Sequence, residues 1–365
     1  MKTGDDRDGP MNPIPLQPSG FNLGGWLSQS PLTDRHAERF IVPEDIHRIA
    51  AWGFNSVRLP VDAEWLFQGG GRGHLDARRF DFVLKALGWM KNAGLHVMLD
   101  VHETPWHSFA RPQQHDLWLD PDSLAAYTRQ SVELVSRLKG WNAPLWIDVL
   151  NEPVAKDPSD WHKVLEVLVP ALREADPART LVLESAQWGH VSHLEALADA
   201  VGGEGLVLSF HFYEPLFITH QHARWWKEGK PYTEDVPYPG PVPKVEEYLS
   251  RPDLPPETRG KIEEQKGRYW DKKSLRELLA PVVGLIRKGF TLNCGEFGVI
   301  QEAPNATRLN WTRDMLELFA ESGVGWHYWT YRAMDFGVCD GPYPSDREFL
   351  RADLLEILKK GVVIP

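Results

Sequence analysis

The sequence predicts an α/β fold, a (β/α)8 TIM barrel with a subdomain inserted after its sixth strand. Short apolar runs, roughly four to eight residues each, alternate with stretches of helical apolar spacing along almost the whole chain. This alternation favours a parallel sheet with right-handed crossovers, and eight units is the number that closes a barrel. The chain has 365 residues, of which 42% are hydrophobic, so it can build the large core that a barrel requires.

Each expected strand is a short apolar run that ends in charged residues, Gly or Pro. The second run, FNSVRLP, ends at Pro60, and the third, LHVMLDV, follows a helix stop at Gly94. The eight strands are expected at 21–25, 54–60, 95–101, 145–150, 180–184, 206–212, 291–296 and 325–330.

The helices are expected between these strands, where apolar residues recur every three or four positions, as they do from Phe80 to Met90. The eight helices are expected at 43–51, 76–92, 123–138, 161–174, 192–200, 273–288, 307–321 and 350–359. A doubly wound open sheet is the alternative fold. It has less support, because Gly24-Gly25-Trp26 after the first strand is no dinucleotide-binding fingerprint.

Two segments stand outside this alternation. Residues 1–19 are polar and rich in proline, and we expect a flexible N-terminal segment ahead of a barrel over 20–365. A long stretch with eight prolines between Pro231 and Pro256 follows the sixth strand, and we expect an inserted subdomain at 224–272. An insertion there lies at the C-terminal end of the barrel, where it either walls a cleft or is a solvent-facing embellishment.

Charge and composition exclude several classes of partner. Forty Lys and Arg against 51 Asp and Glu give a formal net charge of −11, which repels phosphate backbones and anionic lipid. Every apolar run is far shorter than the roughly 20 residues of a membrane span, and the N-terminus lacks the apolar stretch of a secretory signal. We expect no nucleic acid and no membrane as partner, and a protein that is cytoplasmic or secreted with its signal absent from this sequence.

Metal and nucleophilic serine chemistry have little support in the sequence. Neither of the two cysteines has a second cysteine at metal-ligand spacing. His220-Gln221-His222 and the pair His102 and His107 offer imidazoles, but there is no HExxH motif. A Ser-His-Asp hydrolase would need a G-x-S-x-G elbow, which does not occur. We therefore expect no metal and no cofactor.

Polar residues gather at the expected carboxyl ends of the strands, where active sites form in barrels. They are Arg58, His102, Asn151, Glu152, Glu184, His211, Tyr213, Glu296 and Trp329. Glu152 and Glu296 end the fourth and seventh strands, which face each other across the ring. Two carboxylates that converge there suit glycosidic bond cleavage, since one protonates the leaving oxygen and the other, ionised, meets the positively charged sugar centre.

The other strand-end residues have structural readings as well as functional ones. A guanidinium at Arg58 would hold an ionised carboxylate in place and lower its pKa, although an arginine alone is more often part of a structural ion pair. His102 and His211, taken singly, suit core histidines that bind a backbone carbonyl. Only the combination with the two glutamates favours a catalytic site.

These residues lie in motifs that resemble glycoside hydrolase family 5, the cellulase-type retaining β-glycosidases. The resemblance spans 22–336. Its motifs occur in the family's order: SVRLP at 56–60, LDVH at 99–102, LNEP at 150–153, HFY at 211–213, GEFG at 295–298 and WTY at 329–331. The stretch FITHQHARWW, the insertion that follows it and CGEFGVI are most similar to the compact clostridial-type endoglucanases, which carry a subdomain at this place.

The resemblance implies a role for each matched residue. Glu152 would be the acid/base and Glu296 the nucleophile. Arg58 and Tyr213 would orient Glu296, while His211 would lie near Glu152. The residues expected to bind or orient the sugar are His102, Asn151, Trp329, Asn22, Trp26 and Trp188, with Asn151 bonding the 2-hydroxyl and Trp329 stacking under the ring.

The implied function is that of a retaining endo-β-1,4-glucanase, a cellulase or mixed-linkage β-glucanase, acting as a monomer on neutral β-glucan. A β-mannanase, an exo-β-1,3-glucanase or a β-glucosidase is the alternative, and a non-catalytic carbohydrate-binding barrel is a remoter one. Sixteen tryptophans outnumber the 15 phenylalanines and 9 tyrosines, and flat indoles suit sugar faces. Five lie in or near the strand-end loops: Trp26, Trp106, Trp188, Trp225 and Trp226.

Overall fold

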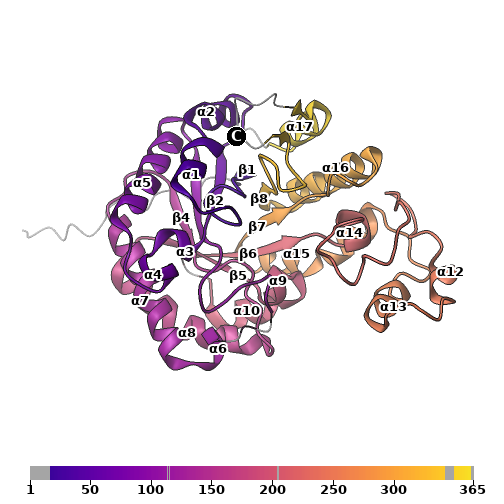
Figure 1. The fold of residues 1–365 in the computed structure, drawn as a ribbon, viewed down its shortest axis with the longest axis horizontal. Coiled ribbons are helices and arrows are strands. Elements are labelled where there is room, and N and C mark those ends of the chain that lie inside the picture. Colours follow the sequence, from indigo (N-terminus) through magenta and orange to yellow (C-terminus); the bar gives the residue numbers. More distant parts are fainter. Residues whose placement is uncertain (1–16, 113, 115, 204, 342–348, 363–365) are drawn as a thin grey trace, which may run out of the picture.

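A computed structural model describes residues 17–112, 114, 116–203, 205–341 and 349–362. Eight parallel strands follow one another around a closed barrel in chain order, with the helices outside (Figure 1). The first strand pairs with the second and also with the eighth, which closes the ring. The predicted (β/α)8 barrel is confirmed. The expected flexible segment 1–19 falls mostly on residues 1–16, which lie outside the described residues.

All eight predicted strands are present. Their bounds are Ser19–Asn22 (β1), Ser56–Val61 (β2), His96–Val101 (β3), Leu145–Asp148 (β4), Thr180–Glu184 (β5), Leu206–Phe212 (β6), Thr291–Phe297 (β7) and Gly325–Tyr328 (β8). The first strand lies earlier than the predicted 21–25, because a turn with Gly25 at a φ of 75° takes the chain out of the sheet. A further pair of two-residue strands, Cys339–Asp340 (β9) and Phe349–Leu350 (β10), lies outside the barrel.

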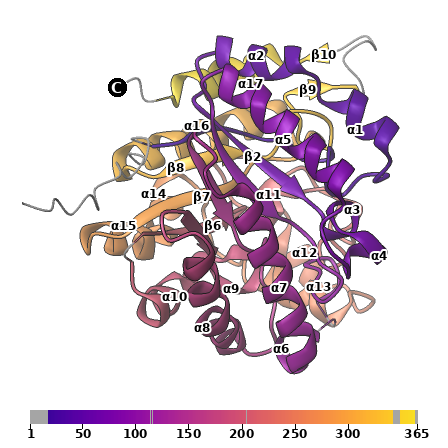
Figure 2. The ribbon, with the colours of Figure 1, turned by 90° about the vertical axis from the view of Figure 1, so that its left-hand side faces the viewer.

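The long helices cover the outside of the barrel, and Figure 2 shows α5, α7 and α8 along one side of it. Their bounds are Pro43–Ala51 (α2), Ala77–Asn92 (α5), Pro121–Leu138 (α7), Pro158–Ala175 (α8), Leu194–Val201 (α10), Asn305–Ser322 (α16) and Ala352–Lys360 (α17). The single helix predicted at 273–288 is wrong. It is split into Lys272–Leu278 (α14) and Ala280–Arg287 (α15), because Pro281 lacks the N–H that a continuous helix needs.

The remaining helices are mostly single turns, too short to show apolar periodicity in the sequence. They are Asp34–Phe40 (α1), Ala63–Leu66 (α3), Gln68–Gly71 (α4), Asp116–Leu119 (α6), Ala186–Gly189 (α9), Val191–His193 (η1), Leu216–Thr219 (α11), Val245–Leu249 (α12) and Pro256–Glu263 (α13). Within the described ranges, no helix has the length and apolar character that crossing a membrane requires.

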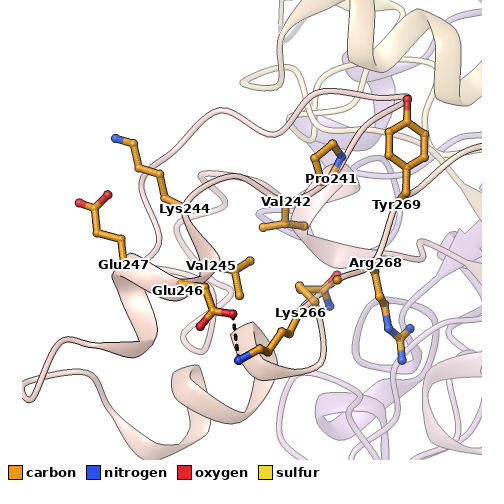
Figure 3. A pocket seen from close by; sticks show the side chains of 11 residues that line it. Pro241, Val242, Lys244, Val245, Glu246, Glu247, Lys266, Arg268 and Tyr269 are labelled. Atoms are coloured by element: carbon orange, nitrogen blue, oxygen red, sulfur yellow. Dashed lines mark ion pairs between the residues drawn. The ribbon is translucent and has the colours of Figure 1, made fainter.

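The segment between β6 and α14 makes an excursion from the barrel, in which α12 and α13 stand outside the ring of helices (Figure 1). The excursion is closed at its base by backbone hydrogen bonds in both directions between Gly240 and Trp270, at 2.9 and 3.0 Å. The hydroxyl of Tyr238 donates to Asp314 of α16 at 2.7 Å and so fastens this base to the barrel. A hollow of about 440 Å³ is lined by residues between Pro241 and Tyr269 (Figure 3).

The interior of the barrel is layered. Met98, Trp146, Val182 and Val207, one from each of β3 to β6, form a small apolar cluster separate from the main core. Successive side chains of a strand alternate between its faces, so the inward neighbours of Met98 on β3 are two residues away, at His96 and Asp100. The apolar cluster thus lies between a lower layer that contains His96 and an upper layer that contains Asp100.

The lower layer holds two buried histidines that share one serine. Ser56 Oγ lies 3.1 Å from His96 Nδ1 and 2.8 Å from His327 Nε2. Burial lowers the pKa of His96 to about 3, and burial, to which the charge of Arg58 adds, lowers the pKa of His327 well below its usual value. Both histidines are therefore neutral in the folded protein at neutral pH.

We expect these histidines to make the fold acid-sensitive. The unfolded chain takes up a proton on His96 as the pH falls through about 6.5, whereas the folded chain does not, so the free energy of unfolding decreases on acidification. Between pH 6.5 and 5 the contribution of His96 is about 2 kcal/mol. Urea unfolding at pH 7 and pH 5 would measure this. The difference in the free energy of unfolding between the two pH values should be smaller in His96→Gln than in the wild type by that amount. His47→Gln, at an exposed position of α2, is the matched control, and equal pH dependence in all three proteins would contradict the expectation.

Candidate active site

The upper layer of the barrel is organised around one fully buried guanidinium. β2 places Arg58 inside the ring, where its Nη1 donates to Glu296 Oε1 at 2.8 Å and to Asn22 Oδ1 at 3.1 Å. Its Nη2 donates to Asn151 Oδ1 at 2.8 Å and to Glu184 Oε1 at 2.9 Å. Since the planar fork of arginine presents five N–H donors, one side chain can fix groups from several strands at once.

Two buried aspartates complete the surroundings of Arg58. Its Nη2 lies 3.1 Å from Asp100 Oδ2 and 3.1 Å from Asp148 Oδ2. Burial would lower the pKa of Arg58, but the negative charges of the surrounding carboxylates, Asp100, Glu184 and Glu296 among them, outweigh it and raise this pKa above its ordinary value. Burial, together with the charge of Glu184, raises the pKa of Asp148 well above the usual range, although Arg58 opposes this. This raised pKa favours the neutral form of Asp148, which carries no negative charge toward the guanidinium.

Glu296 is held at both carboxylate oxygens. Arg58 binds Oε1, and the hydroxyl of Tyr213 donates to Oε2 at 3.0 Å. A β-bulge aims the side chain, because the register of β6 and β7 passes from Phe210 opposite Cys294 to His211 opposite Glu296 and leaves Gly295 unpaired. A Cβ atom on this glycine would lie 2.9 Å from Ser209 Oγ and 3.0 Å from His211 Nε2, so no larger residue fits.

Glu152 approaches from the opposite side of the ring. It follows β4 with a φ of 44°, and its backbone N–H donates to Glu184 Oε2 at 2.7 Å. Its carboxyl Oε1 lies 2.9 Å from His211 Nδ1. Burial raises the pKa of Glu152, and the hydrogen bond and charge of His211 offset this only in part. The carboxyl group therefore keeps its proton to a higher pH than an ordinary glutamic acid does.

The two glutamates converge on His211. One side-chain ligand atom each from Glu152, His211 and Glu296 lie within 4.8 Å of one another, so the nearest oxygens of the two acids are separated by no more than this distance. A metal cation bound by this group would compete with the Nδ1 hydrogen bond of His211, since both ring nitrogens already lie within 3.0 Å of a carboxylate oxygen.

His102 and Trp329 form a second part of the site. His102 Nδ1 lies 2.7 Å from Asp100 Oδ2, and its ring is stacked on the indole of Trp329 with 5.8 Å between ring centres and 5° between planes. Trp329 also presses on Gly24, where a Cβ atom would lie 2.7 Å from the indole. Within the described part of the chain, His102 Nε2 and the side-chain nitrogen of Asn151 have no hydrogen-bond partner.

The structure therefore gathers nine of the residues singled out at the strand ends, and Asn22 with them. Trp26 is not among them, and its expected role in substrate binding is corrected. Its indole is 1% exposed, donates to the carbonyl of Ala37 at 2.7 Å and stacks on Trp89 at 6.2 Å, which leaves no free face for a sugar. Trp106 is also buried, whereas Trp188 and Trp225 are 44% and 50% exposed.

Residues 18–335 match the family model described as "Cellulase (glycosyl hydrolase family 5)". The chain belongs to glycosyl hydrolase family 5. This family 5 chain is 31% identical over 345 residues to Endoglucanase C of Acetivibrio thermocellus, covering 94% of the chain and 98% of that protein. It is 25% identical over 308 residues to Cellodextrinase A of Ruminococcus flavefaciens, covering 84% of the chain and 82% of that protein. It is a glycoside hydrolase.

The same architecture recurs among solved structures. Thermotoga maritima Cel5A in complex with cellobiose superimposes with a TM-score of 0.71 over 94% of this chain and 97% of that one, at 23% identity. At this level of identity the likeness concerns the fold, and it agrees with the closed barrel of the family 5 chain.

Three buried acids of this family 5 hydrolase, Asp100, Asp148 and Glu184, contact Arg58 in the site. The strand-end pattern predicts a place for Glu184 but no contact for it, and it does not single out Asp100 or Asp148. A signal was present, because each is a single acid in an otherwise apolar run and lies two residues from an inward-facing neighbour. An acid at such a position must be paired, so it points to a cation in the barrel.

We expect Arg58→Lys to damage both activity and stability. Lysine keeps the charge but has three donors on a flexible stem, so Asp100, Asp148 and Glu296 cannot all keep their partner. Loss of ion pairs at this burial costs about 3 kcal/mol, and kcat should fall roughly 100-fold or more. Thermal unfolding and steady-state kinetics would measure both. Arg78→Lys, which alters an exposed pair with Asp34, should change neither, and wild-type kcat in Arg58→Lys would contradict the role given to the guanidinium.

Proposed function

We propose that this family 5 hydrolase is a retaining endo-β-1,4-glucanase that cleaves β-glucan by double displacement, with Glu296 as nucleophile and Glu152 as acid/base. The observation that carries the proposal is the approach of one oxygen of Glu152 to within 4.8 Å of an oxygen of Glu296. Retaining glycosidases hold their carboxyl groups about 5 to 5.5 Å apart, whereas inverting ones need roughly 6.5 Å or more to admit a water molecule.

In the first step, an oxygen of Glu296 attacks the anomeric carbon while the bond from that carbon to the leaving oxygen breaks. The hydrogen bonds from Arg58 and Tyr213 stabilise the ionised nucleophile and fix its orientation. Glu152, whose pKa is raised by its burial, transfers its proton to the leaving oxygen. The product of this step is a glycosyl ester on Glu296.

In the second step, Glu152 acts as a base and Glu296 is the leaving group. Glu152, now ionised, accepts a proton from water, whose oxygen forms the new bond to the anomeric carbon as the ester to Glu296 breaks. His211 supports the ionised form of Glu152 through its Nδ1 hydrogen bond. The side-chain nitrogen of Asn151 is suited to the sugar 2-hydroxyl, since its oxygen is already bound by Arg58.

The substrate class rests on the relatives and on the aromatic surface. Endoglucanase C, which this chain matches over 98% of that protein's length, supports internal cleavage of a β-glucan. Trp188 and Trp225 expose large indole faces, which suit the apolar faces of glucosyl units in an extended chain. A formal net charge of −11 suits a neutral polysaccharide better than an acidic one.

Two isosteric variants test the assignment of the acids. Glu296→Gln removes the nucleophile, so kcat should fall roughly 10⁴-fold or more on every substrate. Glu152→Gln removes the proton donor, so activity should be lost on β-glucan but largely retained on 2,4-dinitrophenyl β-cellobioside, whose leaving group needs no protonation. Circular dichroism would establish that both variants fold.

The control for stereochemistry uses the wild-type enzyme. Proton NMR of the first-formed sugar should show the β-anomer, as double displacement requires. Formation of the α-anomer, or equal losses on both substrates in Glu152→Gln, would refute the proposed roles.

A panel of polysaccharides tests the substrate class. Barley β-glucan and carboxymethyl cellulose should release reducing sugars together with a rapid fall in viscosity, and mannan and laminarin should release far less. Trp188→Ala should raise KM for barley β-glucan about tenfold through the loss of stacking, with little effect on an aryl cellobioside. Trp141→Ala, which alters a tryptophan before β4 at the other end of the barrel, is the control. Preference for mannan or laminarin would reject the β-1,4-glucan assignment.

A further inference from the structure

Glu184 is a buried carboxylate that joins the groups around both acids. It ends β5, and its side chain is fully buried. Oε1 accepts hydrogen bonds from Arg58 Nη2 at 2.9 Å and from His211 Nε2 at 3.0 Å, while Oε2 accepts from the backbone N–H of Glu152 at 2.7 Å. All of these contacts face the protein, so Glu184 lies behind the pair of acids.

We propose that Glu184 is a positioning residue that fixes a proton on His211 Nε2 and thereby controls both the orientation and the ionisation of Glu152. The inference rests on the acid/base role proposed for Glu152. It assigns to β5 a part in the reaction, exerted through His211 and through the backbone of Glu152.

The hydrogen bonds of Glu184 determine which nitrogen of His211 carries a proton. Glu184 Oε1 is an acceptor for Arg58, and the pKa of Glu184 is lowered to about 2, because the charge and hydrogen bond of His211 and the charge of Arg58 outweigh its burial. An ionised carboxylate only accepts, so the Nε2 atom of His211 that meets the same oxygen must carry its hydrogen. The tautomer of His211 is thereby decided.

The other ring nitrogen, His211 Nδ1, faces the carboxyl group of Glu152. With Nε2 protonated, His211 Nδ1 either accepts a hydrogen bond from the hydroxyl of protonated Glu152 or, in the imidazolium, donates one to Glu152 Oε1, whether that acid is ionised or carries its proton on Oε2. The 2.9 Å contact serves both states of the acid/base. The side chain of Glu152 can therefore change its protonation between the two displacement steps without a rearrangement of its partner.

The charges around His211 decide which state is favoured. The groups that face this cluster from the surrounding strands are Glu152, Glu184, Glu296, Arg58, Asp148, Tyr213 and Cys294. Burial lowers the pKa of His211, but the charges of Glu184 and Glu296 outweigh it and raise this pKa well above its usual value. The resulting imidazolium restrains the rise that burial imposes on the pKa of Glu152.

Removal of the negative charge of Glu184 should raise the pKa of Glu152. When the charge of Glu184 is removed, His211 loses its proton at a lower pH, and Glu152 is left without an adjacent cation. Glu184 also repels ionised Glu152 directly, but His211 contacts Glu152 and acts on its pKa more strongly, so the loss of the cation outweighs the loss of this repulsion and the pKa of Glu152 rises. Since the protonated form of Glu152 is the acid in the first step, activity should persist to higher pH on the alkaline side.

The experiment compares Glu184→Gln with Glu184→Asp. In Glu184→Gln, the alkaline limb of the kcat/KM profile should move up by about one pH unit. The kcat should also fall, because the amide has one acceptor oxygen and cannot serve both the Glu152 N–H and the donors of Arg58 and His211. Glu184→Asp keeps the charge, so the limb should stay near its wild-type position even though its shorter reach lowers kcat. Glu133→Gln, which alters a carboxylate that binds His74 and the backbone of Leu75, is the matched control and should shift nothing.

A spectroscopic measurement keeps the test independent of activity and of the variants' folding. Histidine-selective ¹⁵N NMR of the wild-type enzyme, assigned with His211→Gln, should show both ring nitrogens of His211 protonated at pH 7. A nonprotonated Nε2 in the wild type, or an unmoved alkaline limb in folded Glu184→Gln, would overturn the proposal. If Glu152→Gln fails its leaving-group test while the NMR result holds, the proposed function fails and the proton placement stands.

Discussion

The structure of the catalytic end depends on a single guanidinium. Arg58 of β2 contacts side chains from five other barrel strands: Asn22 of β1, Asp100 of β3, Asp148 of β4, Glu184 of β5 and Glu296 of β7. Each of these contacts fixes a strand end relative to the others. The short distance between the two acids is therefore a property of the ring as a whole, because both are tied to groups that Arg58 holds.

So many charges can be buried together because they nearly cancel. The pKa values of Arg58, His102 and His211 are raised, which favours their charged forms, and these cations face Asp100, Glu184 and Glu296. Asp148 and Glu152, whose pKa values are also raised, are favoured in their neutral forms. A buried cluster that balances its charges avoids most of the desolvation penalty that an isolated charge would incur. The same arrangement raises the pKa of Glu152 while it pairs Glu296 with Arg58.

Much of this could be predicted from the sequence, for reasons that individual residues show. Strands such as 206–212 were recognised because apolar runs between turn signals survive in any tertiary context, and Glu152 and Glu296 were recognised because a strand end in a barrel is a place for chemistry. The expected sugar contact of Trp26 is wrong, because a sequence position near the barrel mouth does not report that the indole turns inward and donates to the carbonyl of Ala37. The break before Pro281 and the bulge at Gly295 depend on local backbone geometry, which apolar periodicity does not report.

The paired hydrogen bonds between Gly240 and Trp270 give the excursion a narrow neck. Because these bonds hold residues 240 and 270 together, the closure entropy of the barrel depends little on residues 241–269 between them, and a change in their number costs the fold little. The segment between Gly240 and Trp270 can therefore change in length and sequence during evolution without altering the contacts of Arg58 inside the barrel.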